Sequence, residues 1–139
     1  PLINSRLETI DEKISFKKLI KLKRCIAIAD GFYEWKRTEK EKKPFFFRRE
    51  DKKIIYFAGI YDENEFCLIT EQASKNVLEI HHRQPVILNQ KDLKSYLDLQ
   101  LDGSAFLKEA RKPRLEFYEV SKDVNKPSNN SISLIQSLN

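Results

Sequence analysis

The sequence predicts an α+β fold, in which a curled, mainly antiparallel β-sheet is flanked by short helices. Runs of β-branched and aromatic residues follow one another through the first half of the chain, separated by charged, turn-like connectors. Shorter stretches with apolar residues three and four positions apart lie before and after these runs, which is typical of amphipathic helices. With 139 residues, of which 40% are hydrophobic, the chain suits a single domain with one core over residues 1–139.

The first half of the chain predicts one helix and four strands. Ser15 is a good N-cap residue for a helix over 15–22. The predicted strands are 25–37, 44–49, 54–61 and 66–70. Their connectors at 38–43, 50–53 and 62–65 are rich in charged and turn-forming residues, so three successive hairpins are expected. Such a meander can curl toward a barrel.

In the second half, short helices and strands alternate. Residues 71–80 have helical composition, and a turn carrying two histidines follows. A short buried strand is expected over 85–88, and Asn89 is placed to cap a helix over 91–97. The sequence then predicts a helix over 104–110, a last strand over 115–120, and a loop-like end in which only 132–135 is more ordered.

The charge balance permits a polyanionic partner. The chain has 26 Lys and Arg residues against 21 Asp and Glu residues, which gives a net charge of +5. A solvated, lysine-rich surface gives the same count and is the commoner explanation. Charge alone therefore leaves both explanations open.

Cysteine usage and hydropathy indicate a soluble, cytoplasmic protein without a metal or cofactor. Cys25 and Cys67 lie in apolar, strand-like runs, where buried thiols in a reducing compartment are expected. The chain has no Cys-x-x-Cys spacing, and its only two His residues are adjacent, which makes a poor zinc site. No apolar run approaches the roughly 20 residues that a membrane-spanning helix needs.

Glu34 is the residue that most needs an explanation. It lies in the segment Ala-Asp-Gly-Phe-Tyr-Glu-Trp at 29–35, next to the only Trp of the chain. A carboxyl group held among aromatic side chains loses hydration, which favours proton exchange near neutral pH. A strand whose Glu faces water is the ordinary alternative.

Other polar residues could meet Glu34 if the strands curl into one sheet. These residues are Asn4, Arg6, Thr70, His81 and Arg83. Together they offer an amide that orients an oxygen, an imidazole for proton transfer and two guanidinium groups for phosphate. Each of these residues is weak evidence for a functional site on its own. A histidine in a loop, for example, usually has a structural role. The set also lacks a nucleophile, because no Gly-x-Ser-x-Gly motif occurs and neither Cys is in reactive surroundings.

Several segments carry a resemblance to a known family. Residues 4–9 read Asn-Ser-Arg-Leu-Glu-Thr, residues 31–35 read Gly-Phe-Tyr-Glu-Trp, and residues 80–83 read Ile-His-His-Arg. In this order they resemble motifs of the SOS response-associated peptidase (SRAP) family, whose members recognise abasic sites in single-stranded DNA. Shorter matches occur at 43–45, 58–60, 66–70 and 120–125, so the resemblance covers nearly the whole chain.

The resemblance implies a reaction. In the family, an N-terminal Cys attacks the aldehyde of the abasic site with its amine, and its thiol then closes a thiazolidine ring to leave a stable DNA–protein crosslink. On the matching positions, Asn4 would hold the N-terminal group and the sugar. Glu34 would move protons during ring opening and amine attack, and His81 would protonate or stabilise the departing sugar oxygen.

The resemblance also implies a partner and the residues that bind it. Single-stranded DNA with abasic sites would be the partner, and the protein would associate with the nucleoid during DNA damage. Arg6 and Arg83 would contact phosphates, and Thr70 would contact the DNA backbone near the lesion.

The chain departs from the family pattern at two places. It begins at the Asn-Ser-Arg motif, so we expect the domain to be N-terminally incomplete and to lack the nucleophilic Cys, which the amine of Pro1 cannot replace because it has no thiol. Gln84 stands where the family usually has Met. Missing strands would leave apolar edges, which predicts either a homodimer or an N-terminal segment that completes the sheet.

Three functions therefore remain open: a crosslinking protein of abasic sites, a module that shields single-stranded DNA without covalent chemistry, and a cysteine peptidase limited to its own processing.

Overall fold

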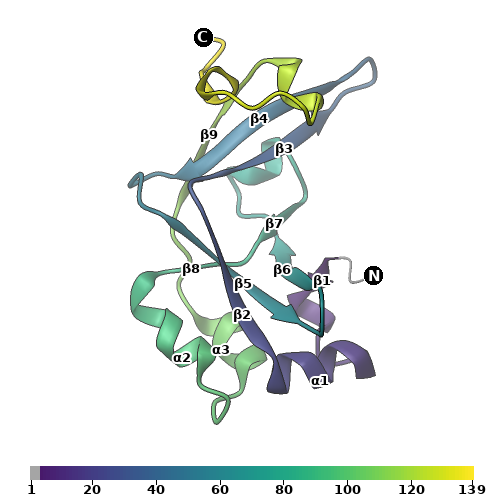
Figure 1. The fold of residues 1–139 in the computed structure, drawn as a ribbon, viewed down its shortest axis with the longest axis vertical. Coiled ribbons are helices and arrows are strands. Elements are labelled where there is room, and N and C mark those ends of the chain that lie inside the picture. Colours follow the sequence, from purple (N-terminus) through teal and green to yellow (C-terminus); the bar gives the residue numbers. More distant parts are fainter. Residues whose placement is uncertain (1–3) are drawn as a thin grey trace.

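The structure is a computed structural model that describes residues 4–139, and it contains two antiparallel-dominated sheets and three short α-helices (Figure 1). This composition confirms the predicted α+β class. The strands are β1 (Ser5–Arg6), β2 (Arg24–Ala29), β3 (Phe32–Arg37), β4 (Lys42–Arg49), β5 (Ile55–Tyr61), β6 (Phe66–Gln72), β7 (Arg83–Pro85), β8 (Ile87–Leu88) and β9 (Leu115–Glu119). The helices are α1 (Ile14–Leu22), α2 (Leu93–Leu97) and α3 (Gly103–Glu109), with short 3₁₀ helices η1 (Leu7–Thr9), η2 (Val77–Glu79), η3 (Gln90–Asp92), η4 (Lys122–Asn125) and η5 (Ile132–Ile135).

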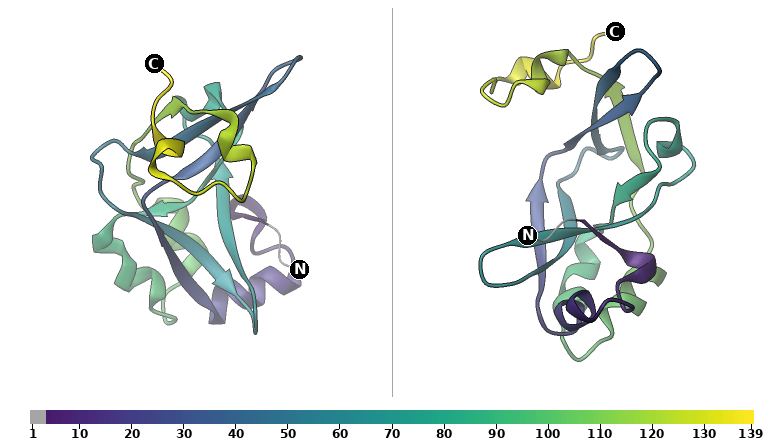
Figure 2. Two further views of the ribbon diagram at one scale, coloured as in Figure 1. Left: turned by 45° about the horizontal axis from the view of Figure 1, so that its top comes forward. Right: turned by 90° about the vertical axis from the view of Figure 1, so that its right-hand side faces the viewer.

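The two sheets occupy different parts of the molecule. The larger sheet has the order β1-β6-β5-β2, with β7 added to β6 and β8 added to β5, and among its strands in residues 4–139 only the β1–β6 pair is parallel. The smaller sheet has the order β3-β4-β9 and is antiparallel throughout. The three α-helices gather at the end away from the smaller sheet, and the C-terminal segment lies beyond that sheet at the other end (Figures 1 and 2).

Two hydrophobic clusters hold these parts together. One packs the helices against the larger sheet, around fully buried Ile10, Ile60 and Tyr96. The other is rich in aromatic side chains and joins the two sheets, with Phe47 from β4 and Phe57 from β5. Burial of large apolar side chains is the main stabilising contribution in such a core. The second cluster fixes how the two sheets lie relative to each other.

The single strand predicted over 25–37 is wrong, because the chain leaves one sheet and enters the other at Gly31. β2 belongs to the larger sheet and β3 to the smaller one. A Cβ atom at Gly31 would lie 2.3 Å from Phe46 Cζ and 2.5 Å from the carbonyl oxygen of Phe47. Only glycine lets the backbone pass this close to β4. Glu34 is thereby placed on a different sheet from Thr70 and Arg83.

The helix predicted over 71–80 is also wrong. β6 continues to Gln72 and pairs with β7, in the register Glu71 opposite Gln84 and Gln72 opposite Arg83. The ladder supplies the hydrogen bonds that a helix would otherwise give these residues. Only η2 is helical in the segment, and Val77 at its start is 2% exposed and packs in the core between the sheets.

Three smaller expectations also need correction. The connector 50–53 joins β4 to β5 in the other sheet, so it is not a hairpin, whereas 38–43 and 62–65 do connect paired strands. The side chain of Ser15 does not cap α1, which begins at Ile14. Asn89 does not cap a helix through its side chain either, because its amide donates to the Arg111 carbonyl oxygen and its oxygen accepts from Arg49.

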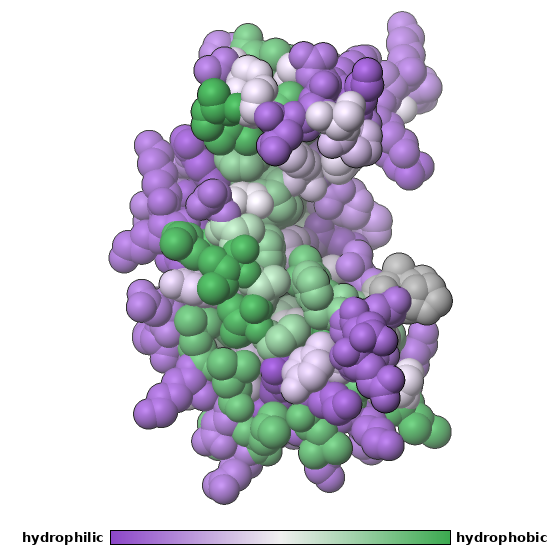
Figure 3. Space-filling view, in the orientation of Figure 1, coloured by the Kyte–Doolittle hydropathy of each residue, from purple (hydrophilic) through white to green (hydrophobic). Residues whose placement is uncertain are grey.

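Strand β2 is an apolar edge. Within residues 4–139 it pairs only with β5, so its other side presents unpaired backbone groups. Ile28 on β2 is 68% exposed and nearby Ile54 is 47% exposed. Figure 3 shows hydrophobic residues gathered along the middle of this face. None of the helices in residues 4–139 has the length and apolar character that spanning a membrane requires.

Candidate functional site

A pocket of about 220 Å³ lies where the two sheets face each other. Its apolar wall comes from Phe32, Tyr33, Phe57 and Leu68. Its polar lining contains five of the six site residues expected from the sequence: Asn4, Glu34, Thr70, His81 and Arg83. These five residues come from both sheets and from segments far apart in the sequence. The fold therefore brings most of the expected constellation into one cavity.

Glu34 and His81 lie next to each other in the wall of this pocket. His81 Nε2 lies 3.7 Å from Glu34 Oε1, and the two side chains are 29% and 28% exposed. The same carboxylate oxygen accepts the backbone N–H of Trp35 at 3.2 Å, which fixes its orientation. Glu34 is therefore partly buried and partnered, unlike a glutamate on an open strand face.

The backbone of Arg83 holds the ring of His81 through Nδ1. This nitrogen lies 3.1 Å from the Arg83 backbone nitrogen and 3.2 Å from the Arg83 carbonyl oxygen. The N–H is a partner for an unprotonated Nδ1 and the carbonyl oxygen is a partner for a protonated one, so both protonation forms of this nitrogen have a partner. The other ring nitrogen, Nε2, faces Glu34. The pair thus sets an imidazole, which can give or take a proton, beside a carboxylate.

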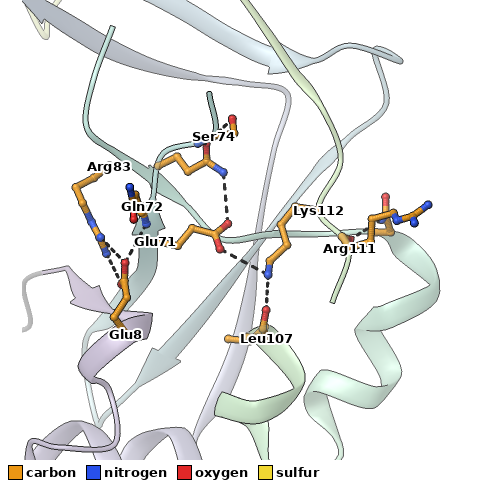
Figure 4. A network of polar contacts seen from close by, with 10 residues as sticks. Glu8, Glu71, Gln72, Ser74, Arg83, Leu107, Arg111 and Lys112 are labelled. Atoms are coloured by element: carbon orange, nitrogen blue, oxygen red, sulfur yellow. Dashed lines mark hydrogen bonds and ion pairs between the residues drawn. The ribbon is translucent and has the colours of Figure 1, made fainter. Parts of the chain in front are cut away.

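Arg83 is held by Glu8, a residue that the sequence did not single out (Figure 4). Arg83 Nη1 donates to Glu8 Oε2 at 2.6 Å, and Nη2 donates to Glu8 Oε1 at 2.8 Å. Nη2 also donates to Thr70 Oγ1 at 3.2 Å, and Glu8 accepts the backbone N–H of Gln72 at 3.1 Å. The buried Nε of Arg83 has no hydrogen-bond partner among residues 4–139. The guanidinium is therefore fixed in direction before any ligand binds.

Glu8→Gln is expected to lower the free energy of unfolding by about 1 kcal/mol at pH 7. The hydrogen bond from Arg83 lowers the pKa of Glu8 from 4.5 to about 2. Because the folded pKa lies below the unfolded one, this stabilisation is complete above pH 4.5 and is lost as the pH falls toward 2. The expected loss is small because the Glu8 side chain is 41% exposed and solvent screens the pair.

Urea unfolding of the wild type and of Glu8→Gln, measured from pH 7 down to pH 2, checks this prediction. Glu116→Gln is the matched control, since Glu116 pairs with Arg48 at 2.7 Å on the smaller sheet and does not line the pocket. A difference between wild type and Glu8→Gln that stayed constant down to pH 2 would contradict it.

Arg6 is the expected site residue that the pocket does not include. It is exposed on β1, opposite Thr70 in the parallel pair with β6. Its position at the outer side of the site suits a contact with a ligand that extends beyond the pocket.

Gln84 belongs to a polar network with Ser74, Glu71 and Lys112, three residues that Figure 4 labels. Gln84 is 9% exposed, and its amide oxygen accepts from the backbone N–H of Ser74 at 2.9 Å and from the Ser74 hydroxyl at 3.1 Å. Its amide nitrogen donates to Glu71 at 3.4 Å, and Glu71 pairs with Lys112 at 3.5 Å. Both polar atoms of the Gln84 amide group therefore have hydrogen-bond partners.

The two cysteines lie within strands, away from the pocket lining. Burial raises the pKa of the Cys25 thiol and that of the Cys67 thiol. Since the thiolate is the nucleophilic form, both thiols are poor nucleophiles at neutral pH.

Comparison with known proteins decides the family. The family model described as "SOS response associated peptidase (SRAP)" matches residues 1–127. The chain belongs to the SRAP family. Among its relatives, the abasic site processing protein YoqW of Bacillus subtilis (strain 168) is 37% identical over 98% of this SRAP chain and 67% of the relative. The abasic site processing protein YedK of Escherichia coli (strain K12) is 33% identical over 98% of this chain and 67% of the relative.

A solved structure shares the fold of this SRAP chain. A protein from Bacteroides thetaiotaomicron superposes with a TM-score of 0.83 at 30% sequence identity, over 96% of this chain and 65% of that protein. The SRAP chain thus spans about two thirds of the length of the relatives and of the solved structure that it matches.

Proposed function

We propose that this chain recognises abasic sites in single-stranded DNA and provides the proton-transfer groups for their covalent capture. The observation that carries the proposal is the Glu34–His81 pair, 3.7 Å apart in a pocket that also contains Asn4, Thr70 and Arg83. Two relatives bear the name abasic site processing protein, which supports the substrate class. Residues 1–139 would act as one domain in this function.

The proposed chemistry uses the two groups in turn. An amine that attacks the aldehyde of the opened sugar must lose a proton, and the Glu34 carboxylate accepts it. The resulting carbinolamine loses its oxygen as water, which requires a proton donor, and the His81 imidazole, whose Nε2 faces Glu34, would supply the proton. Asn4 would orient the sugar oxygen. The thiol then adds to the imine carbon and closes the ring.

In this family reaction the amine and the thiol belong to an N-terminal cysteine. Cys25 and Cys67 lie within β2 and β6, and Pro1 lies outside the described residues. The proposal therefore requires the cysteine to come from a polypeptide segment other than these residues. The positive charge of Arg83 and the exposed Arg6 would contact phosphates on either side of the lesion, with Thr70 near the DNA backbone.

A denaturing gel tests this function. The 139-residue chain and a form preceded by the family's N-terminal cysteine segment are each incubated with an abasic single strand and with an intact strand of the same sequence. We expect a heat-stable adduct only when the cysteine form meets the abasic strand. Absence of this adduct band would contradict the crosslinking proposal.

Two other outcomes would assign a different function. Salt-sensitive binding of both strands without any adduct would favour a shielding module. Proteolysis near the added cysteine that disappears when the cysteine is removed would favour the self-processing peptidase.

We further propose that the apolar edge strand β2 is covered in the working protein, either by the N-terminal segment or by a second copy of the chain. The exposed Ile28 and the unpaired side of β2 support this. Sedimentation of the chain with and without the N-terminal segment distinguishes the two possibilities. If the N-terminal segment covers β2, adding it abolishes self-association of the chain. A DNA partner also implies that the protein works in the cytoplasm, close to the nucleoid.

A further inference from the structure

Glu8 covers the charged end of Arg83 beside the pocket (Figure 4). Its carboxylate accepts from both terminal nitrogens of the guanidinium, at 2.6 Å and 2.8 Å. The Arg83 side chain is 15% exposed, whereas the Glu8 side chain is 41% exposed. A charged ligand that approaches this pair from solvent therefore meets the carboxylate more readily than the guanidinium.

The pair carries no net charge at neutral pH. The hydrogen bond from Arg83 lowers the pKa of Glu8 from 4.5 to about 2, so the carboxylate stays ionised, and a guanidinium is always protonated in proteins. Opposite charges in contact cancel most of each other's field, and the Glu8 carboxylate also repels a phosphate group. Arg83 therefore attracts phosphate much less than a free arginine does.

Arg6 provides a comparison within the same site. It lies on β1 opposite Thr70, and the hydroxyl of Thr70 accepts from Arg83 at 3.2 Å, so both arginines neighbour the same residue of β6. Arg6 is exposed, and within residues 4–139 it belongs to no ion pair. One arginine of the site is thus a free charge, whereas the charge of the other is compensated.

We infer that Glu8 withholds the charge of Arg83 from the phosphates of DNA, which makes Glu8 a specificity-determining residue. The inference rests on the proposed function. Attraction between cations and phosphates is the part of DNA binding that intact and damaged strands share. A compensated Arg83 still lines the pocket and directs its N–H groups, but it adds little to this shared attraction. Glu8 thereby lowers the affinity for intact strands and leaves the choice of ligand to the pocket.

The salt dependence of binding tests this inference. A fluorescently labelled single strand without a lesion is titrated with the 139-residue chain at several salt concentrations, and anisotropy gives the affinity. Glu8→Gln should steepen the slope of log affinity against log salt by about 0.7, the contribution of one phosphate contact on a single strand. At about 0.15 M salt, such a contact corresponds to roughly fourfold tighter binding.

The direction of the change separates this role from a purely structural one. If Glu8 only supported the fold, its replacement would weaken binding or leave it unchanged. An unchanged slope, or weaker binding of the intact strand by Glu8→Gln, would therefore overturn the inference. Glutamine keeps the size of the side chain, and the expected loss of about 1 kcal/mol leaves a folded protein for the titration, which circular dichroism checks.

Three further variants assign the effect to the pair. Glu8→Asp keeps the negative charge and should retain the wild-type slope. The double variant Glu8→Gln, Arg83→Gln removes both charges and should retain it as well. Glu116→Gln is the matched control, because it changes the net charge by the same amount and frees Arg48, which does not line the pocket. Equal steepening by Glu8→Gln and Glu116→Gln would overturn the specific role of Glu8.

Specificity is measured with a second strand, which carries an abasic analogue that has no aldehyde and so cannot form an adduct. Glu8→Gln should lower the ratio of abasic to intact affinity by about fourfold, because the intact strand gains a contact to Arg83 that a bound lesion already makes. A ratio equal to that of the wild type would overturn the specificity role.

The outcomes also distinguish this inference from the proposed function. A preference of the wild type for the abasic strand, together with equal slopes for wild type and Glu8→Gln, overturns the inference alone. Equal affinity of the wild type for the two strands, together with a steeper slope for Glu8→Gln, supports the charge effect of Glu8 and overturns abasic recognition. Absence of binding to either strand overturns both.

Discussion

Glu34→Gln is expected to slow formation of the abasic-site adduct about 10²-fold or more, since general acid–base groups typically contribute 10²- to 10⁴-fold. Glutamine keeps the size of the side chain and can still accept the Trp35 N–H, but it cannot take up a proton from the attacking amine. His81→Ala should have an effect of similar size, because it removes the imidazole whose Nε2 lies 3.7 Å from Glu34 Oε1. The double variant should be little slower than either single variant, because the two groups act as one unit.

Single-turnover rates read from denaturing gels at pH 7 measure this effect, in the form that carries the N-terminal cysteine segment. Binding of abasic DNA should change little in Glu34→Gln, since the substitution affects proton transfer more than contact. Glu116→Gln, which removes a carboxylate from β9 of the same sheet, should react at the wild-type rate. An unchanged rate in both Glu34→Gln and His81→Ala would refute the assigned roles.

Arg24→Gln is expected to lower the free energy of unfolding by about 3 kcal/mol or more, because hydrogen bonds of a charged group contribute about 1.5–3 kcal/mol each. Arg24 is 7% exposed, and four backbone carbonyl oxygens surround its guanidinium. The distances are 2.6 Å to Ile20, 2.9 Å to Tyr96, 2.9 Å to Asp98 and 2.6 Å to Leu101. One side chain therefore connects β2 with α1, α2 and the loop before α3. A shorter amide cannot reach all four carbonyls, and a buried acceptor left without a donor costs free energy.

Thermal and urea unfolding measure the loss. Arg48→Gln is the control, since Arg48 forms a partly exposed ion pair with Glu116 and such pairs contribute about 0–1 kcal/mol. Gly103→Ala disturbs Arg24 by an independent route, because an added Cβ would lie 2.5 Å from Arg24 Nε. We expect both Arg24→Gln and Gly103→Ala to be clearly less stable than Arg48→Gln. Equal stability of Arg24→Gln and the control would show that the four carbonyl contacts contribute little.

The strands were predictable where local composition alone determines them. The runs at 44–49, 54–61 and 66–70 became β4, β5 and β6 within two residues, because their β-branched and aromatic side chains suit a pleated surface. The break at Gly31 was not predictable in this way. Its cause is the close approach of Phe46 and Phe47, which are neighbours only in the folded molecule. The segment 71–80 was misjudged for a related reason, since its strand character comes from pairing with β7.

The residues of the candidate site were predicted mainly from sequence motifs and less from the local pattern of apolar and polar residues. Glu34 and His81 stood out through their segments, and the fold places them together. Glu8 was missed although it lies in the Asn-Ser-Arg-Leu-Glu-Thr segment, because its importance depends on Arg83, 75 residues further along the chain. Its place two residues after Arg6 in that segment was the only available signal. A partner so distant in sequence is revealed only by the folded structure.

The crossing of the chain at Gly31 has a consequence for how the protein tolerates change. Glu34 belongs to the smaller sheet, and His81 lies in the connection between β6 and β7 of the larger one, so the two groups proposed to transfer protons are attached to different sheets. Their separation of 3.7 Å is set by the aromatic packing between the sheets, which includes Phe47 and Phe57. A substitution in that packing would change the distance between Glu34 and His81 although it touches neither residue. If the two groups transfer protons as proposed, reactivity and stability are coupled, and substitutions in the core act on both at once.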